Sequence, residues 1–145
     1  MSDEWDFEDL EKRIAEYRGR PDKYRMDGSP YPPGLEGLLE WGRDLEDTRG
    51  RIVEQETLWN GIWLSTVWLG LDHSFDPDGP PLIFETMAFN QITEEGRYDL
   101  WQERWSTLAE AEAGHAWVKQ RLASIGFTLK LWWELIWEKV REEQR

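Results

Sequence analysis

The sequence predicts an α+β fold: a short antiparallel β-sheet centred on one hairpin and packed by three or four helices. Two patterns carry this prediction. β-Branched and aromatic residues concentrate between residues 50 and 90, and apolar residues recur at helical spacing on both sides of that stretch. The third observation is the length of 145 residues, which is typical of one domain that buries a core without disulfides. We therefore expect residues 1–145 to form a single domain.

The N-terminal helix is predicted over residues 1–19. Its first residues are mostly acidic, which suits a helix N-terminus, and Gly19 and Pro21 end the pattern. Residues 20–37 are rich in proline and glycine, which disfavour helices and central strands, so we expect a surface loop there. A short helix is expected to follow between Leu35 and Trp41.

The β-hairpin core is predicted over residues 50–90. The stretch from Trp63 to His73 is apolar on both faces of a strand, so we expect a helix on one face and a loop or a second copy on the other. A turn is expected at residues 76–79, Asp-Pro-Asp-Gly, because proline presets the first central residue and glycine accepts a positive φ. The strand from Leu82 to Asn90 then returns, with Glu85 as its one charged residue.

Two helices are predicted after the hairpin, over residues 106–123 and 127–143, whereas residues 97–104 show a mixed pattern. Ser106 is the expected N-cap of the first helix. The second helix has a wide apolar stripe with three tryptophans, which a single packing surface cannot easily bury. We predict that its interface with a second copy or a partner protein consists of Trp132, Trp133, Ile136 and Trp137.

Charge and composition exclude several functions. The chain has 30 acidic and 17 basic residues, a net charge of -13, which disfavours direct nucleic-acid binding and favours a basic partner. The absence of cysteine excludes a disulfide scaffold, a thiolate nucleophile and cysteine-ligated metal centres. No export signal, membrane-spanning segment or cofactor motif is visible, so we expect a cytoplasmic protein without a cofactor or a membrane partner.

The two histidines of the chain define a candidate chemical site. Together with Asp72, the candidate catalytic or metal-binding residues are His73, Glu85 and His115, because imidazole and carboxylate groups ligate divalent metals or share acid–base work. The alternative is structural: His115 bonds to Glu85 while Asp72 and His73 simply end a strand. A separate hypothesis is a nucleotide-sized ligand between hairpin and helix, in a pocket formed by Trp68, Asp72, Arg97 and Tyr98.

Four segments resemble small uncharacterised proteins of bacteriophage and prophage genomes. They read STVWLGLDHSF at 65–75, GPPLIFETM at 79–87, RY at 97–98 and EAEAGH at 110–115. The resemblance covers about residues 63–122. Residues 91–105 form a longer insert than the family pattern has, and the tryptophan-rich C-terminal segment also departs from it. The resemblance implies a viral origin and a strand–turn–strand–helix core, and it implies no reaction.

These observations together predict a small acidic accessory protein that binds and modulates a host or defence protein without catalysis. Mimicry of nucleic acid by its acidic surface is one route to such binding. Two alternatives remain open: a small metal-binding protein or enzyme that uses Asp72, His73, Glu85 and His115, and a protein that sequesters a small ligand.

Overall fold

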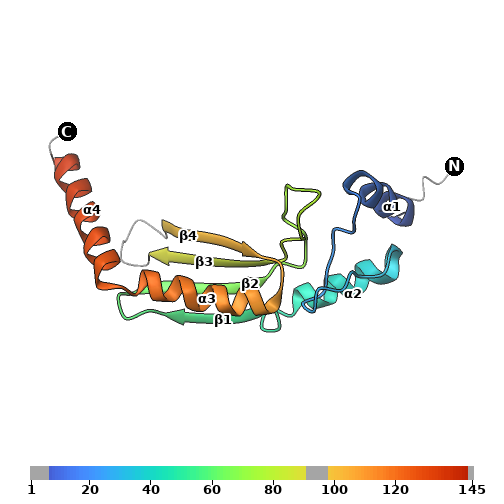
Figure 1. The fold of residues 1–145 in the computed structure, drawn as a ribbon, viewed down its shortest axis with the longest axis horizontal. Coiled ribbons are helices and arrows are strands. Elements are labelled where there is room, and N and C mark those ends of the chain that lie inside the picture. The colour runs from blue at the N-terminus through green and yellow to red at the C-terminus, as the bar shows by residue number, and fades with distance from the viewer. Residues whose placement is uncertain (1–6, 91–97, 144–145) are drawn as a thin grey trace.

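The computed structural model describes residues 7–90 and 98–143 of the chain, with the side chains of a few of these left aside. The described residues form four helices and four strands, which confirms the α+β class (Figure 1). In chain order the elements are α1 (Phe7–Arg18), α2 (Gly34–Glu46), β1 (Ile52–Thr57), β2 (Ile62–Trp68), β3 (Phe84–Asn90), β4 (Tyr98–Trp105), α3 (Leu108–Leu122) and α4 (Ile125–Glu143).

The four strands form one antiparallel sheet in the order β1-β2-β3-β4. The predicted hairpin is present, because β2 pairs with β3 from Ile62 opposite Asn90 to Trp68 opposite Phe84. Both strands are shorter than predicted. The expected turn closes the connection, with the Gly79 N–H donating to the Asp76 carbonyl at 3.3 Å.

Strand β4 lies outside the predicted hairpin core of residues 50–90. It pairs with β3 and places Trp101 and Trp105 on the same face as Phe84. Glu103, which lies between the two tryptophans on that face, is exposed. This acidic residue interrupts the alternation of apolar and polar residues, so the sequence pattern alone did not indicate a strand.

The predicted loop of residues 20–37 is wrong at its C-terminal end, because helix α2 begins at Gly34. The helix is also longer than the expected Leu35–Trp41, since it continues to Glu46. Glycine at position 37 does not break this helix. A Cβ there would lie 1.6 Å from the carbonyl oxygen of Pro32, so only glycine permits this close approach.

The two C-terminal helices also differ from their predicted bounds. Helix α3 is capped by Thr107 rather than Ser106. The Thr107 hydroxyl accepts from the Glu110 N–H at 3.1 Å and the Glu110 carboxylate accepts from the Thr107 N–H at 3.3 Å. Helix α4 begins at Ile125, two residues early, and the Ser124 hydroxyl accepts the Phe127 N–H at 3.2 Å.

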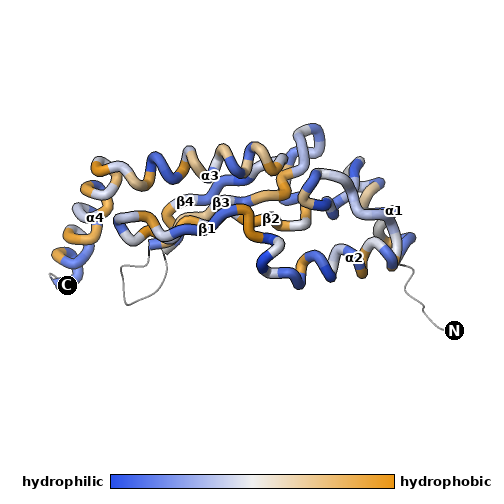
Figure 2. Tube along the Cα trace, turned by 90° about the horizontal axis from the view of Figure 1, so that it is seen from below, coloured by the Kyte–Doolittle hydropathy of each residue, from blue (hydrophilic) through white to orange (hydrophobic). Residues whose placement is uncertain are grey.

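Helix α3 lies along one face of the sheet (Figures 1 and 2), and the core lies between them. One cluster of buried side chains, toward α4, contains Leu58, Ile62, Leu64, Ala88, Val118, Leu122 and Leu131. A second, toward α2, contains Tyr24, Tyr31, Trp68, Ile83, Phe84 and Ala111. We expected both faces of β2 to be covered, but on the face opposite α3 the side chains of Trp63 and Val67 are only half-buried. The cover is therefore complete only on the face that packs against α3.

Helices α1 and α2 lie at one end of this elongated molecule, and α4 extends from the other end (Figure 1). Within α4, the described residues that are buried are Thr128 and Leu131. Among residues 7–90 and 98–143, no helix combines the length and apolar character that crossing a lipid bilayer requires.

Candidate functional site

The structure does not bring the predicted chemical set together. His115 is fully buried on the side of α3 that faces the sheet. Glu85 points to the opposite face of the sheet, because its neighbours Phe84 and Thr86 are the residues of β3 that face α3. There the Glu85 carboxylate accepts from Arg104 Nε at 3.0 Å and from Gln102 at 2.7 Å. The expected contact between His115 and Glu85 is therefore wrong.

Asp72 anchors the connection between β2 and β3. Its buried carboxylate accepts from Arg20 at 2.8–2.9 Å and from the backbone N–H groups of Ser74 at 2.8 Å and Leu82 at 3.0 Å. Arg20 also donates to the carbonyl groups of Asp76 and Gly79. The next residue, His73, has its N–H bonded to the Leu82 carbonyl at 3.0 Å. Asp72 thus joins the segment after α1 to the hairpin connection.

The predicted ligand pocket is not assembled from its expected residues. Trp68 is buried and donates its indole N–H to the Tyr24 carbonyl at 3.1 Å. Trp68 and Tyr98 pair with opposite ends of β3, six residues apart, which corresponds to about 20 Å along a strand. The Tyr98 side chain and the whole of Arg97 lie outside the described residues. A groove of about 480 Å³ beside Asp72 is lined by Tyr17, Arg20, Asp72, Ser74, Phe75 and Pro77, without Trp68.

His115 ends a chain of buried hydrogen bonds that begins at Trp105. The Trp105 indole N–H donates to the Thr86 hydroxyl at 2.9 Å, since an indole nitrogen can only donate. The Thr86 and Thr66 hydroxyls lie 2.7 Å apart, and the Thr66 hydroxyl lies 2.8 Å from Nδ1 of His115. Among the described residues the Thr86 hydroxyl has no acceptor other than Thr66, so it donates to Thr66, and Thr66 donates to His115.

This direction assigns the tautomer of His115. Because Nδ1 accepts, the ring proton lies on Nε2, which faces Oε1 of Glu56 at 3.2 Å. The other carboxylate oxygen of Glu56 accepts from the Lys119 ammonium group at 2.7 Å. Every group in this series of hydrogen bonds, from Trp105 to Lys119, therefore has a partner of the correct kind. The hydrogen bonds hold α3 against β1, β2 and β3.

The carboxylates that lie beside His115 were not among the predicted site residues. Glu54 and Glu56 alternate on β1 and so point to the same face, a signal that the spacing alone contained. Glu54, Glu56 and His115 offer ligand atoms within 4.8 Å of one another, a separation that a divalent ion could bridge. However, the Nε2–H group of His115 donates a hydrogen bond to Glu56, and Lys119 supplies the positive charge, so the geometry favours an internal hydrogen-bond network over a metal site.

The pKa of Glu56 is lowered from its ordinary value of 4.5, first by the hydrogen bond from Lys119 and then by that from His115. A lowered pKa in the folded state stabilises the protein above pH 4.5, and this contribution is lost as the pH falls through the folded value. We expect wild type to be more stable than Glu56→Gln at about pH 7, and the difference to shrink toward about pH 2. Urea unfolding across this range measures the difference, and a difference that stays constant with pH would contradict the assignment.

The second candidate site is the surface of α4 that points away from the sheet. We define the outward face of α4 as Ile125, Leu129, Trp132, Trp133, Ile136, Trp137 and Val140, all of which are exposed. Trp132 and Trp133 expose 58% and 62% of their surface, and the rings of Trp133 and Trp137 meet edge to face at 5.7 Å. The structure thus places every residue of the predicted interface on one exposed face.

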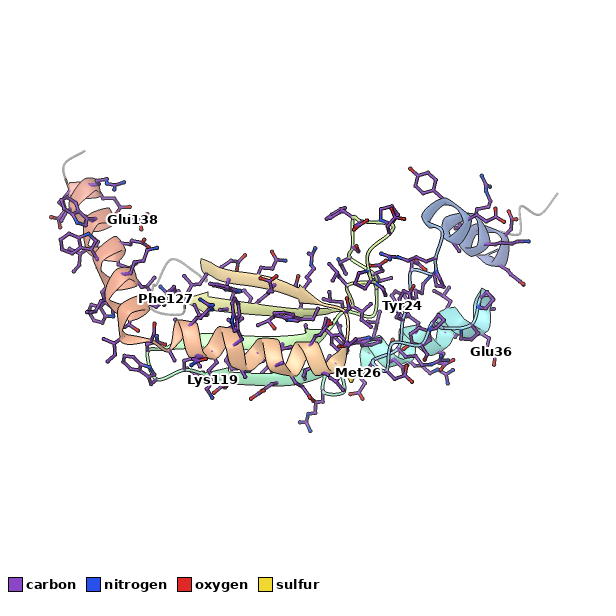
Figure 3. The ribbon with its side chains drawn as sticks, in the orientation of Figure 1. Tyr24, Met26, Glu36, Lys119, Phe127 and Glu138 are labelled. Carbon is purple, nitrogen blue, oxygen red and sulfur yellow. The ribbon has the colours of Figure 1, made fainter. Side chains whose placement is uncertain are left out.

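Charge and apolar surface occupy different parts of the chain. Residues 125–145 contain four basic and four acidic residues, so the net charge of -13 lies entirely in residues 1–124. Figure 3 shows α4 carrying its side chains beyond the end of the sheet, with Phe127 at its base and Glu138 farther out. The outward face of α4 is therefore an apolar surface on a segment without net charge, at one end of an acidic molecule.

Comparison of the chain with protein-family models, with curated proteins and with solved structures finds no match.

Proposed function

We propose that this chain is a small acidic accessory protein, of the phage type that its sequence resembles, which acts by binding other proteins rather than by catalysis. The observation that carries the proposal is the outward face of α4, with seven large apolar side chains exposed on one helix. Contiguous apolar patches of this kind are typical of protein–protein contact sites, and tryptophan is enriched among the residues that dominate binding energy.

The rest of the molecule favours a basic partner. Residues 1–124 carry the whole net charge of -13, and α2, which lies toward the end of the molecule opposite α4 (Figure 1), exposes Glu36 and Glu46. A negative surface speeds association with a positive one and discourages contact with nucleic acid. A host or defence protein with a basic groove suits this surface, and the acidic residues would there take the place of nucleic-acid phosphates.

The rival functions have less support. A metal or acid–base site built on Asp72, His73, Glu85 and His115 would need side chains that lie on different faces of the sheet. A nucleotide pocket built on Trp68 and Tyr98 would need residues at opposite ends of β3.

The test is affinity capture of the tagged full-length protein from host extract, with quantitative mass spectrometry. The α4 variant carries Trp133→Ala and Trp137→Ala, and the control carries Phe75→Ala, at a side chain that is 97% exposed in the β2–β3 connection. We expect about a tenfold lower recovery of specific partners with the α4 variant, since hot-spot residues contribute about 2 kcal/mol or more. Equal recovery with all three proteins would contradict the proposal.

A further inference from the structure

We propose that the outward face of α4 is covered by α4 of a second copy of this chain, paired antiparallel, so that the working molecule is a dimer. This inference rests on the proposed function, because it names the occupant of the same surface. In such a dimer the two acidic bodies, residues 1–124 of each copy, bind a basic partner together, so loss of the α4 contact also weakens the binding of that partner.

Six of the seven residues on the outward face, all except Trp137, are arranged symmetrically about a point between residues 132 and 133. Reading outward from that point, Trp132 matches Trp133, Leu129 matches Ile136, and Ile125 matches Val140. At about 100° per residue, these six positions occupy a single stripe roughly 100° wide. A two-fold interface requires each patch to complement itself, so that residue i meets residue j and residue j meets residue i. Antiparallel pairing about this point brings apolar side chains together along the whole stripe.

The charges on α4 suit the same arrangement. Lys130 and Glu134, whose charged groups lie 3.9 Å apart, are outside the stripe on the side of α4 turned away from the partner helix, so pairing through the stripe does not bury them. The segment has no net charge, whereas the acidic body of each copy, residues 1–124, has a net charge of -13 and lies at the N-terminal end of α4 (Figure 1). Antiparallel pairing places the two bodies at opposite ends of the paired helices. A dimer through α4 therefore avoids most of the repulsion between the two acidic bodies.

The available area is sufficient for a modest dimer. A tryptophan side chain buries roughly 150–250 Å², so Trp132 and Trp133, each more than half exposed, offer on the order of 250 Å² per copy. The four aliphatic residues of the stripe raise this to roughly 500 Å² per copy, about 1,000 Å² in total, which is the lower limit for a specific interface. We therefore expect a dissociation constant in the micromolar range.

The first experiment is sedimentation equilibrium of the purified full-length protein from about 1 to about 200 μM, a range that spans micromolar association. We expect the mass to rise from 17.3 kDa toward twice that value. The variant Trp132→Asp with Ile136→Asp should remain a monomer, and its circular dichroism should match wild type because both side chains are exposed. The control Phe75→Asp places the same charge on another exposed side chain and should still dimerise.

The second experiment tests orientation and uses the absence of native cysteine. In the antiparallel pair residue 125 of one copy faces residue 140 of the other. An oxidised mixture of Ile125→Cys and Val140→Cys should form the mixed disulfide. Neither variant alone should cross-link, because the two copies of its thiol would lie about 22 Å apart along the axis, beyond the reach of a disulfide.

Two results would overturn the dimer. One is a wild-type protein that remains monomeric at the highest concentration, and the other is efficient cross-linking of each single variant with itself. Neither would decide the proposed function, which is tested by partner capture. A monomer that loses its partners in the α4 variant would keep the docking function and assign the face to a different protein.

Discussion

Gly114→Ala is expected to destabilise the protein by about 1–3 kcal/mol, the usual cost of overpacking. A Cβ at position 114 would lie 2.3 Å from the ring of Trp105. That ring cannot move away freely, because its N–H donates to the Thr86 hydroxyl and begins the buried chain that ends at His115 and Glu56. Helix propensity alone would predict that Gly114→Ala stabilises the protein, since alanine is favoured over glycine by about 1 kcal/mol within a helix.

The matched control is Gly126→Ala in α4, where no atom lies within 4 Å of the added Cβ. This variant should be as stable as wild type or more stable by up to about 1 kcal/mol. Denaturant unfolding of the three proteins measures both effects with the same chemical change. If Gly114→Ala proved as stable as Gly126→Ala, the close packing of α3 on Trp105 would be wrong.

The second large effect is expected for Asp72→Ala, which should lower the free energy of unfolding by about 3–5 kcal/mol, as when one partner of a buried ion pair is removed. The Asp72 side chain is 1% exposed and Arg20 16%. Without the carboxylate, the N–H groups of Ser74 and Leu82 lose their acceptor. The Arg20 guanidinium group loses its only carboxylate partner among the described residues and keeps the carbonyl groups of Asp76 and Gly79. The melting temperature should fall by about 10 °C or more.

Asp78→Ala is the control for this loss. Asp78 lies in the same connection and is exposed, and its described hydrogen bond uses its backbone N–H rather than its carboxylate. Arg20→Ala should destabilise the protein nearly as much as Asp72→Ala, and the double variant should cost less than the two losses added together. Additive losses, or equal stability of Asp72→Ala and Asp78→Ala, would show that the pair does not act as a unit.

Much of the fold could be predicted because it follows local rules. The β2–β3 hairpin, its turn at residues 76–79 and the helix after Thr107 each have a signal within a few neighbouring residues: β-branched and aromatic residues, proline with glycine, or a capping box. Strand β4 was missed because Glu103 interrupts the alternation of apolar and polar residues between Trp101 and Trp105. The candidate chemical set failed for a different reason, since a strand residue such as Glu85 faces one side or the other according to the register of the whole sheet.

The sequence by itself determined that α4 is an amphipathic helix with more tryptophan than one packing surface can bury, because helical spacing depends only on the order of residues. Only the tertiary structure decided which face of that helix remains exposed and which carboxylate meets His115. His115 and Glu56 are 59 residues apart in sequence, and the contact between them exists only because α3 packs across β1. Periodicity determines which residues share a face, whereas packing of distant segments determines what that face contacts.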